Sequence, residues 1–344
     1  MKKMTNAMTM TRVMTMTRVT TSALYSAMCS VLLVAVLGVF GLAFTACSSD
    51  DDGYRFRVGI IQMMDHPSLN EIREAFLDEM YRLGYTDVDF DVRIGPGADM
   101  TALTSIAQVF VGNEVDLIMS ITTPATQAVA NVTSDIPIVF GAVSDPVAAG
   151  LVADLNRPDR NITGTSDNLP VEAVFQLARQ LAPEARTFGF VYNLGEDNSV
   201  AIINRVKEYF AASGFYYYEA PVTGTADVQQ AALSLVGRVD AFFTPTDNTV
   251  AAAMPVFAQV AIEAGLPIFT GADSMVADGG LATVGVNYTV LGIETARIAA
   301  AVLEGTSVAD IPVVVMSDFT PTVNGETAAA IGLDITGLEG AIIR

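Results

Sequence analysis

The chain has 344 residues, of which 51% are hydrophobic and 16% charged, so it can form two domains of ordinary size with large cores. Its formal net charge is −20, and it contains only three lysines, Lys2, Lys3 and Lys207. Because no basic stripe is available to neutralise phosphates, this composition excludes a nucleic-acid-binding protein.

The N-terminus has the features of a secretion signal. Its basic residues, Lys2, Lys3, Arg12 and Arg18, precede an apolar run, Val31–Phe44, that is too short for a membrane span. The following Thr45-Ala46-Cys47 resembles a bacterial lipobox, which implies cleavage before Cys47 and lipidation of its thiol. The alternative is an ordinary signal peptide that is cleaved nearby. We predict a lipoprotein signal peptide over 1–46 and a linker over 47–54.

The number and position of the cysteines limit the chemical roles that the chain can have. The chain has two cysteines, Cys29 in the signal segment and Cys47 at the predicted lipidation site. The remaining chain therefore has no disulfide, no thiol nucleophile and no thiolate metal site.

From Arg57 onward, patterns typical of strands and helices alternate. The strand patterns are Arg57–Met63, Val88–Ile94, Leu117–Ile121 and Ile136–Ala142, and the helical patterns between them are Ser68–Leu83, Met100–Val111 and Thr123–Val132. This alternation predicts a parallel sheet with helices on both faces. Its strand-to-helix turns lie at the carboxyl edge of the sheet, where ligands bind in such folds.

The second half of the chain repeats the first at an offset near 130 residues. Val115–Ala130 and Val239–Ala253 both begin with Val-Asp and continue as a strand, a hydroxyl-rich turn and an alanine-rich helix. Shared βα punctuation without duplication is the alternative. We predict an α/β fold of two similar, doubly wound parallel-sheet domains, with the two turns facing each other across a cleft.

The last part of the chain does not repeat. It reads as a helix, Tyr288–Leu303, an apolar strand, Val313–Phe319, and a short helix, Asn324–Ile331. Chain crossings near Ile162–Asp167, Val286–Tyr288 and Asp318–Pro321 would form a multi-strand hinge that permits closure. The predicted N-terminal lobe is 55–164 plus 288–318, and the C-terminal lobe is 165–287 plus 319–344.

Groups for catalysis are scarce. His66 is the only histidine, and the chain has no Gly-x-Ser-x-Gly elbow, no metal-ligand spacing and no phosphate- or dinucleotide-binding fingerprint. We predict no enzyme, no metal site and no cofactor, and we interpret His66 as a structural or ligand-contacting residue.

Polar side chains gather where strands give way to helices. They are Ser120, Thr122, Thr123, Ser144, Asp145, Asn198, Ser199, Thr246, Asp247 and Asp273. Helix N-termini favour a carboxylate, while Asp247, with Asp145 or Asp273, can neutralise an ammonium group. The set suits a zwitterionic amino acid. Plain helix capping is the alternative for each residue.

Several motifs carry a family resemblance: H-P-S-L at His66–Leu69, T-T-P-A-T-Q-A at Thr122–Ala128, S-D-P-V-A-A-G-L-V at Ser144–Val152, N-I-T-G-T-S-D at Asn161–Asp167, E-D-N-S at Glu196–Ser199, P-T-D-N at Pro245–Asn248 and G-G-L-A-T-V-G at Gly279–Gly285. With them, the mature chain resembles substrate-binding proteins of ABC transporters, specifically the tryptophan/tyrosine or aromatic amino-acid binding family. The resemblance implies a type I periplasmic-binding fold, an ABC permease partner and no catalysis. It also implies ligand contacts from Ser120, Thr122 and Thr123 in one lobe and from Asn198, Ser199 and Asp247 in the other.

Together these features predict a monomeric, lipid-anchored, extracytoplasmic protein on the periplasmic face or outer cell surface. It is expected to bind an apolar, aromatic amino acid by hinge closure, with Asp247 pairing with the ammonium group; a branched or other apolar amino acid is the alternative ligand. Because the chain has no tryptophan, stacking needs Phe, Tyr or His, and Met64 provides a soft apolar wall. The alternative is a ligand-sensing receptor module of the same fold that signals to a membrane partner.

Overall fold

The computed structural model describes residues 53–97, 99–338 and 340–344. The predicted signal peptide, the lipidation site Cys47 and linker residues 47–52 lie outside these ranges. Residues 54–344 form one compact unit that contains two β-sheets. Within the described ranges, no helix combines the length and the apolar character needed to cross a bilayer.

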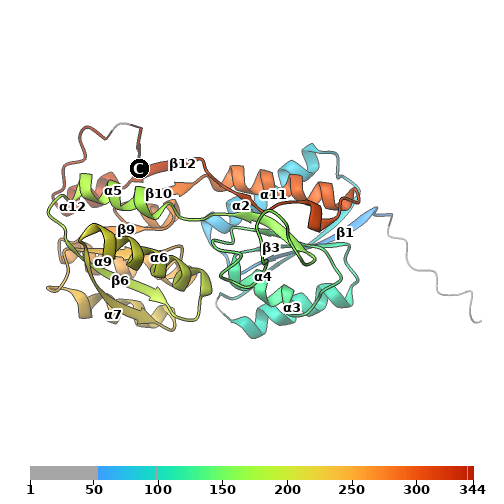
Figure 1. Cartoon of the computed structure of the whole chain (residues 1–344), viewed down its shortest axis with the longest axis horizontal. Coiled ribbons are helices and arrows are strands. Elements are labelled where there is room, and N and C mark those ends of the chain that lie inside the picture. Colours follow the sequence, from blue (N-terminus) through green and yellow to red (C-terminus); the bar gives the residue numbers. More distant parts are fainter. Residues whose placement is uncertain (1–52, 98, 339) are drawn as a thin grey trace, which may run out of the picture. The chain divides into compact units, whose positions relative to one another are not determined.

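The first sheet has the strand order β11-β5-β4-β3-β1-β2, and all its pairs are parallel. Its strands are β1 (Phe56–Gln62), β2 (Val88–Ile94), β3 (Leu117–Ile121), β4 (Ile138–Gly141), β5 (Ile162–Ser166) and β11 (Val314–Val315). Its helices are α2 (Pro67–Arg82), α3 (Met100–Gly112), α4 (Thr123–Ala130) and α11 (Tyr288–Leu303), with a 3₁₀ turn at η2 (Val308–Asp310). Helices α2 and α11 pack side by side, as do α3 and α4 (Figure 1).

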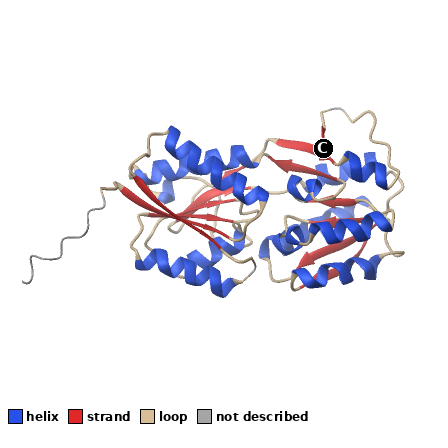
Figure 2. Cartoon of the chain, turned by 180° about the vertical axis from the view of Figure 1, so that it is seen from behind, coloured by secondary structure: helices blue, strands red, loops and turns tan. Residues whose placement is uncertain are grey.

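The second sheet has the order β13-β12-β10-β9-β8-β6-β7. Its strands are β6 (Thr187–Asn193), β7 (Tyr216–Val222), β8 (Ala241–Thr244), β9 (Ile268–Thr270), β10 (Ala282–Val286), β12 (Phe319–Val323) and β13 (Ile342–Ile343). Its helical segments are α5 (Val171–Leu181), α6 (Asp197–Ser213), η1 (Thr225–Asp227), α7 (Val228–Leu235), α8 (Asn248–Ala252), α9 (Met254–Glu263), α10 (Asp273–Ala277) and α12 (Gly325–Ala330). Strand β12 runs antiparallel to β10, and helices flank both sheets (Figure 2).

The two sheets share one topology. Strands β4-β3-β1-β2 of the first follow the same order in space as β9-β8-β6-β7 of the second. This match confirms the predicted α/β fold with two parallel-sheet domains. We call the elements around the first sheet the first lobe and those around the second sheet the second lobe.

One predicted strand is wrong. The apolar run Val313–Phe319 is not continuous, because β11 ends at Val315 in the first sheet and β12 begins at Phe319 in the second. The intervening residues pass between the sheets, so the backbone changes hydrogen-bond partners along a run of uniform hydrophobicity. The lobes are also linked from β5 to α5 and from β10 to α11. The domain boundaries proposed from the sequence remain a prediction.

The lobes have different cores. The first is mainly aliphatic, with residues such as Ile60 and Ile118 fully buried on its central strands. The second centres on phenylalanines, and the rings of Phe175 and Phe210 lie 4.8 Å apart, edge to face. Such pairs add about 0.5–1.5 kcal/mol beyond the area that they bury. Both cores hold the strands rigid and thereby fix the positions of the turns at their carboxyl ends.

Candidate functional site

A cavity lies where the carboxyl ends of the two sets of strands meet. The first lobe lines it with Met64, His66, Ser68, Leu69, Thr122, Thr123, Ala142, Ser144, Asp167 and Tyr288. The second lobe contributes Asn198, Thr246, Asp247, Asn248, Ala251, Ala272, Ser274 and Met275.

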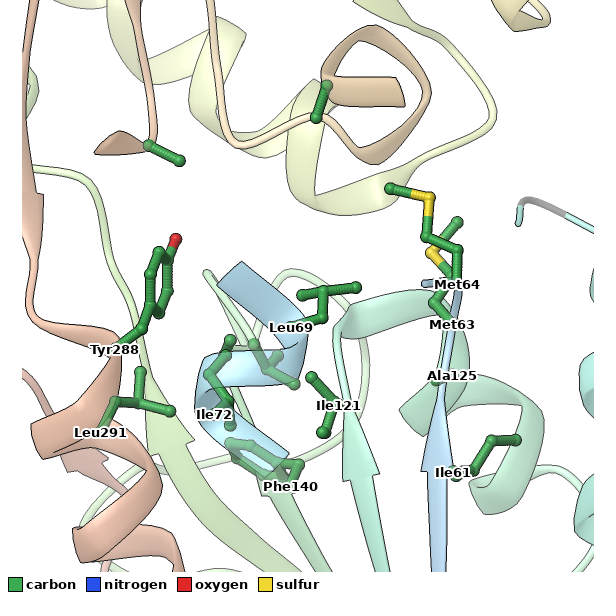
Figure 3. Packing of buried hydrophobic residues seen from close by; sticks show 14 of the residues in the cluster. Ile61, Met63, Met64, Leu69, Ile72, Ile121, Ala125, Phe140, Tyr288 and Leu291 are labelled. Atoms are coloured by element: carbon green, nitrogen blue, oxygen red, sulfur yellow. The ribbon is translucent and has the colours of Figure 1, made fainter. Parts of the chain in front are cut away.

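The turn from β1 to α2 forms one wall. His66 occupies the N-cap position of α2 without a side-chain capping bond, and Pro67 begins the helix. Burial lowers the pKa of His66, so its imidazole is neutral at neutral pH. Figure 3 shows Met64 and Leu69 on this wall, with Tyr288 across from them on α11. The wall therefore combines apolar surface with helix-start N–H groups.

The turns after β3 and β4 carry strained backbone. Thr122 has φ 88° and Ala142 has φ 56°, and both line the cavity. Side chains other than glycine rarely adopt this region, which costs of order 1–3 kcal/mol per residue. The Thr122 N–H donates to the carbonyl oxygen of Gly141 at 3.0 Å, which links the two turns. With this backbone conformation, the start of α4, including Thr123, lies at the cavity wall.

Two buried carboxylates hold the start of α8 in the second lobe. One oxygen of Asp247 accepts from the Val250 N–H at 2.8 Å, and the other accepts from the Asn193 N–H at 2.6 Å. Glu196 accepts from the N–H groups of Asn248 and Thr249 at 3.0 and 2.9 Å. Burial, together with the neighbouring Glu196, raises the pKa of Asp247 to about 7. Asp247 thus faces the cavity as a helix cap.

A third carboxylate, Asp167, follows β5 beside the hinge. Its oxygens accept from the Ser144 hydroxyl at 2.9 Å and from the Tyr288 hydroxyl at 3.4 Å. Burial raises the pKa of Asp167 and, with Asp167 nearby, raises the pKa of Tyr288 well above its ordinary value. The Tyr288 hydroxyl therefore stays protonated and donates.

Two contacts join the lobes around the cavity. The hydroxyls of Ser144 and Thr246 lie 3.1 Å apart, and the Gln127 amide donates to the Asp197 carboxylate at 2.7 Å. The first contact belongs to the cavity wall, and the second lies outside it between α4 and α6.

Eight of the side chains predicted as ligand contacts line this cavity. They are Met64, His66, Thr122, Thr123, Ser144, Asn198, Thr246 and Asp247. Because they come from the segments that follow five different strands, β1, β3, β4, β6 and β8, the fold assembles them as the topology predicted. Their role toward a ligand remains a prediction.

The other four predicted contacts lie off the wall. Ser120 bonds to the Thr126 hydroxyl at 2.9 Å, and Asp145 accepts from the backbone of Ala148. Ser199 is fully buried and bonds to the Asp247 carboxylate. Asp273 pairs with Arg344 at 2.7 Å. Each side chain has a protein partner that occupies it.

The sequence analysis also missed side chains on the wall, among them Ser68, Leu69, Asp167, Ser274, Met275 and Tyr288. Three of these had a signal, because Ser68 and Leu69 lie in the H-P-S-L motif and Asp167 ends N-I-T-G-T-S-D. Tyr288 had none, since only the crossing from β10 to α11 brings it to the cavity.

Unpartnered polar atoms concentrate on the wall. Among the described residues, six buried side-chain polar atoms have no hydrogen-bond partner, and five belong to lining residues: His66 Nε2, Ser68 Oγ, Thr123 Oγ1, Asn198 Oδ1 and Ser274 Oγ. Buried polar atoms are normally paired, so this concentration points to a missing polar ligand. The lining set includes neither lysine nor arginine. The described ranges contain no cluster of His, Cys, Asp and Glu able to hold a metal.

Comparison with known proteins gives matches over most of the chain. Residues 57–339 match the family model described as ABC transporter substrate binding protein. A tyrosine-binding protein of Clostridioides difficile (strain R20291) is 36% identical over 319 residues, which cover 88% of this chain and 92% of that protein.

Solved structures give the same picture. A domain from Streptococcus pneumonia in complex with L-Trp is 32% identical with a TM-score of 0.81, covering 84% of this chain and 99% of that one. A ligand-free, open substrate-binding protein with adhesive properties from Clostridium difficile is 38% identical over the same shares, with a TM-score of 0.67.

Proposed function

Because the chain belongs to the family of ABC transporter substrate-binding proteins, whose members bind solutes and are not enzymes, we propose that it delivers an aromatic amino acid to an ABC importer. The observation that carries this proposal is the set of five unpartnered polar atoms around a cavity that is otherwise partly apolar. Such a wall suits a small molecule with a charged head and an apolar body.

The apolar side chains of the wall support an aromatic ligand. Met64, Leu69 and Met275 offer flexible surface that moulds to a ring, and Tyr288 offers a ring for stacking. The similar proteins agree with this choice, since one is named for tyrosine and another holds L-Trp. The site comprises the eight predicted lining residues together with Ser68, Asp167, Ser274 and Tyr288.

Hinge closure over the ligand has separate support. The TM-score against the L-Trp complex, 0.81, is higher than that against the open protein, 0.67. The sequence identity runs the other way, at 32% to the first and 38% to the second. The contacts Ser144–Thr246 and Gln127–Asp197 join the lobes in this arrangement. We take it as the closed form, from which the lobes part at the three connections between the sheets.

Anchoring and location follow from the N-terminal sequence. A lipid on Cys47 would tether a monomer to the membrane beside an ABC permease, on the periplasmic face or the outer cell surface. The acidic residues Asp50–Asp52 suit a solvated tether. A mass increase on Cys47 in the purified protein, lost in Cys47→Ser, would support this assignment; an unmodified thiol would contradict it.

A thermal-shift screen of the full-length protein against the amino acids tests the ligand. A ligand that binds only the folded state stabilises it by RT ln(1 + [L]/Kd), about 2.7 kcal/mol at a hundredfold excess over Kd. L-Tyrosine or L-tryptophan should raise the melting temperature most, and L-aspartate and L-lysine least. A ranking led by charged amino acids, or no shift with any aromatic one, would refute the proposal.

A further inference from the structure

The cavity contains two buried carboxylates in different states of hydrogen bonding. Asp247 is only 1% exposed, and each of its oxygens accepts a backbone N–H at 2.8 Å or less. Asp167 is 5% exposed, and its side chain accepts from its own backbone N–H and from two hydroxyls, one of them at the long distance of 3.4 Å. Both oxygens of Asp247 are therefore committed to holding the start of α8, whereas Asp167 caps no helix, since Pro170 is the N-cap residue of the following helix α5.

The protein supplies no cation to Asp167. Among the described residues, none of the ion pairs between side chains includes Asp167. The lining residues contain no lysine or arginine, and His66 is held neutral by burial. A buried carboxylate is costly unless a cation pairs with it. A ligand that carries a positive charge would balance the ionised form of Asp167.

We infer that the Asp167 carboxylate, rather than that of Asp247, binds the ammonium group of the amino acid, an inference that rests on the proposed function. The Ser144 and Tyr288 hydroxyls position the Asp167 carboxylate. This places the ammonium beside the hinge, since Asp167 follows β5 and Tyr288 begins α11 directly after the crossing from β10. The Ser144 hydroxyl donates to Asp167 and lies 3.1 Å from the Thr246 hydroxyl of the second lobe. The carboxylate of the ligand then faces neutral donors at the starts of α2 and α4.

Paired ligands test this assignment. L-Tyrosine and 3-(4-hydroxyphenyl)propionate differ only in the ammonium group, and calorimetry on the full-length protein gives the ratio of their affinities. In wild type the ratio should be at least about tenfold in favour of L-tyrosine. In Asp167→Asn it should fall to about one through weaker binding of L-tyrosine alone. Asp167→Ala is the second variant should the amide interfere with folding, which thermal unfolding without ligand reveals.

Asp247→Asn is the matched control, since it neutralises the other buried carboxylate of the same cavity. It should weaken both ligands by similar factors and keep the ratio, because it loosens the start of α8. The assignment is overturned if the ratio survives in both Asp167 variants, or if Asp247→Asn removes it. Wild type that binds neither L-tyrosine nor L-tryptophan would refute the proposed function and this inference with it, a result distinct from a ratio that fails to change.

Discussion

Protonation of individual carboxylates controls how the cavity treats a zwitterion. An ammonium group binds Asp167 in its ionised form, and burial raises the pKa of this carboxyl above its ordinary value of 3.8. Acid therefore competes with the ligand, because protonation of the empty site removes the negative charge that attracts it.

The first prediction is that affinity for L-tyrosine falls as pH drops from about 7 toward 4, the side on which Asp167 takes up a proton. Affinity should fall by up to tenfold per pH unit below the pKa of the empty site. Calorimetry across this range provides the test, with Asp167→Asn as control, since its residual binding should lack this acid limb. An equal slope in wild type and variant would exclude Asp167 as the titrating group.

The second prediction concerns stability at Asp247. The pKa of Asp247 in the folded protein, about 7, lies above its ordinary value of 3.8. The stability that the protonated carboxyl gives the fold is therefore complete below about pH 4 and is lost as pH rises through 7. Relative to Asp247→Asn, wild type should lose on the order of 1.4 kcal/mol per pH unit between these limits.

Urea denaturation of both proteins at several pH values measures this difference. His66 acts in the opposite direction, since its lowered pKa destabilises the fold as pH falls below 6.5, but it is common to both proteins and cancels. A wild-type advantage that grows from pH 4 to pH 7 would have the wrong sign and refute the assignment.

Sequence reasoning could place these residues but could not tell which were free. Strand and helix periodicity put Ser120, Thr123 and Asp247 at the carboxyl ends of strands, and the structure agrees. Whether a hydroxyl meets a ligand or a neighbour depends on packing, and Ser120 meets Thr126 while Thr123 has no partner. Asp167 was overlooked because the partners of its side chain are known only in three dimensions.

At the scale of elements, helix α11 is fixed to α2 by close backbone approach. A Cβ atom added at Gly292 would lie 2.5 Å from the carbonyl oxygen of Ile72 and 2.8 Å from the Cβ of Ala75. No real contact is this short, so any larger residue there pushes the helices apart. Because α11 starts with Tyr288, such a shift also moves one wall of the cavity.

The third prediction is that Gly292→Ala destabilises the protein by about 1–3 kcal/mol, the usual cost of overpacking. Gly112→Ala is the matched control, since it also lies in a helix and its added Cβ would meet nothing within 4 Å. Thermal unfolding should show a lower melting temperature for the first variant and no loss for the second. Equal stability of the two variants would mean that α11 is free to move away from α2.

Element identity was predictable where the local pattern and the partner agree. Strands β2 and β3 and helix α11 have the boundaries that periodicity gives. The run Val313–Phe319 shows why the rest could not be predicted, because hydrophobicity does not record that β11 and β12 pair in different sheets. The start of α8 was also difficult to predict, because the polar residue Asn248 already belongs to the helix.

At the scale of the whole described unit, few contacts hold the lobes together across the cavity. Gln127 on α4 donates a hydrogen bond to Asp197 on α6, and neither residue lines the cavity. A bond that exists only in the closed form strengthens ligand binding without contacting the ligand.

The fourth prediction is that Gln127→Ala weakens binding of L-tyrosine about fivefold, corresponding to the roughly 1 kcal/mol of one hydrogen bond. Gln259→Ala serves as control, since Gln259 makes a 2.9 Å bond to Glu263 within α9 and does not join the lobes. Calorimetry should show reduced affinity for the first variant only. Equal affinity in wild type and Gln127→Ala would show that this contact does not favour closure.

The rings that line the cavity, Tyr288 and His66, are not indoles, and this has a practical consequence for measuring ligand binding. The protein contains no tryptophan, so a captured L-tryptophan would be the only indole in the molecule. Its fluorescence, excited where tyrosine absorbs little, would shift to the blue when the indole is buried in the cavity and return on release. Occupancy, residence time and release could then be followed in real time, with L-tryptophan as its own optical reporter.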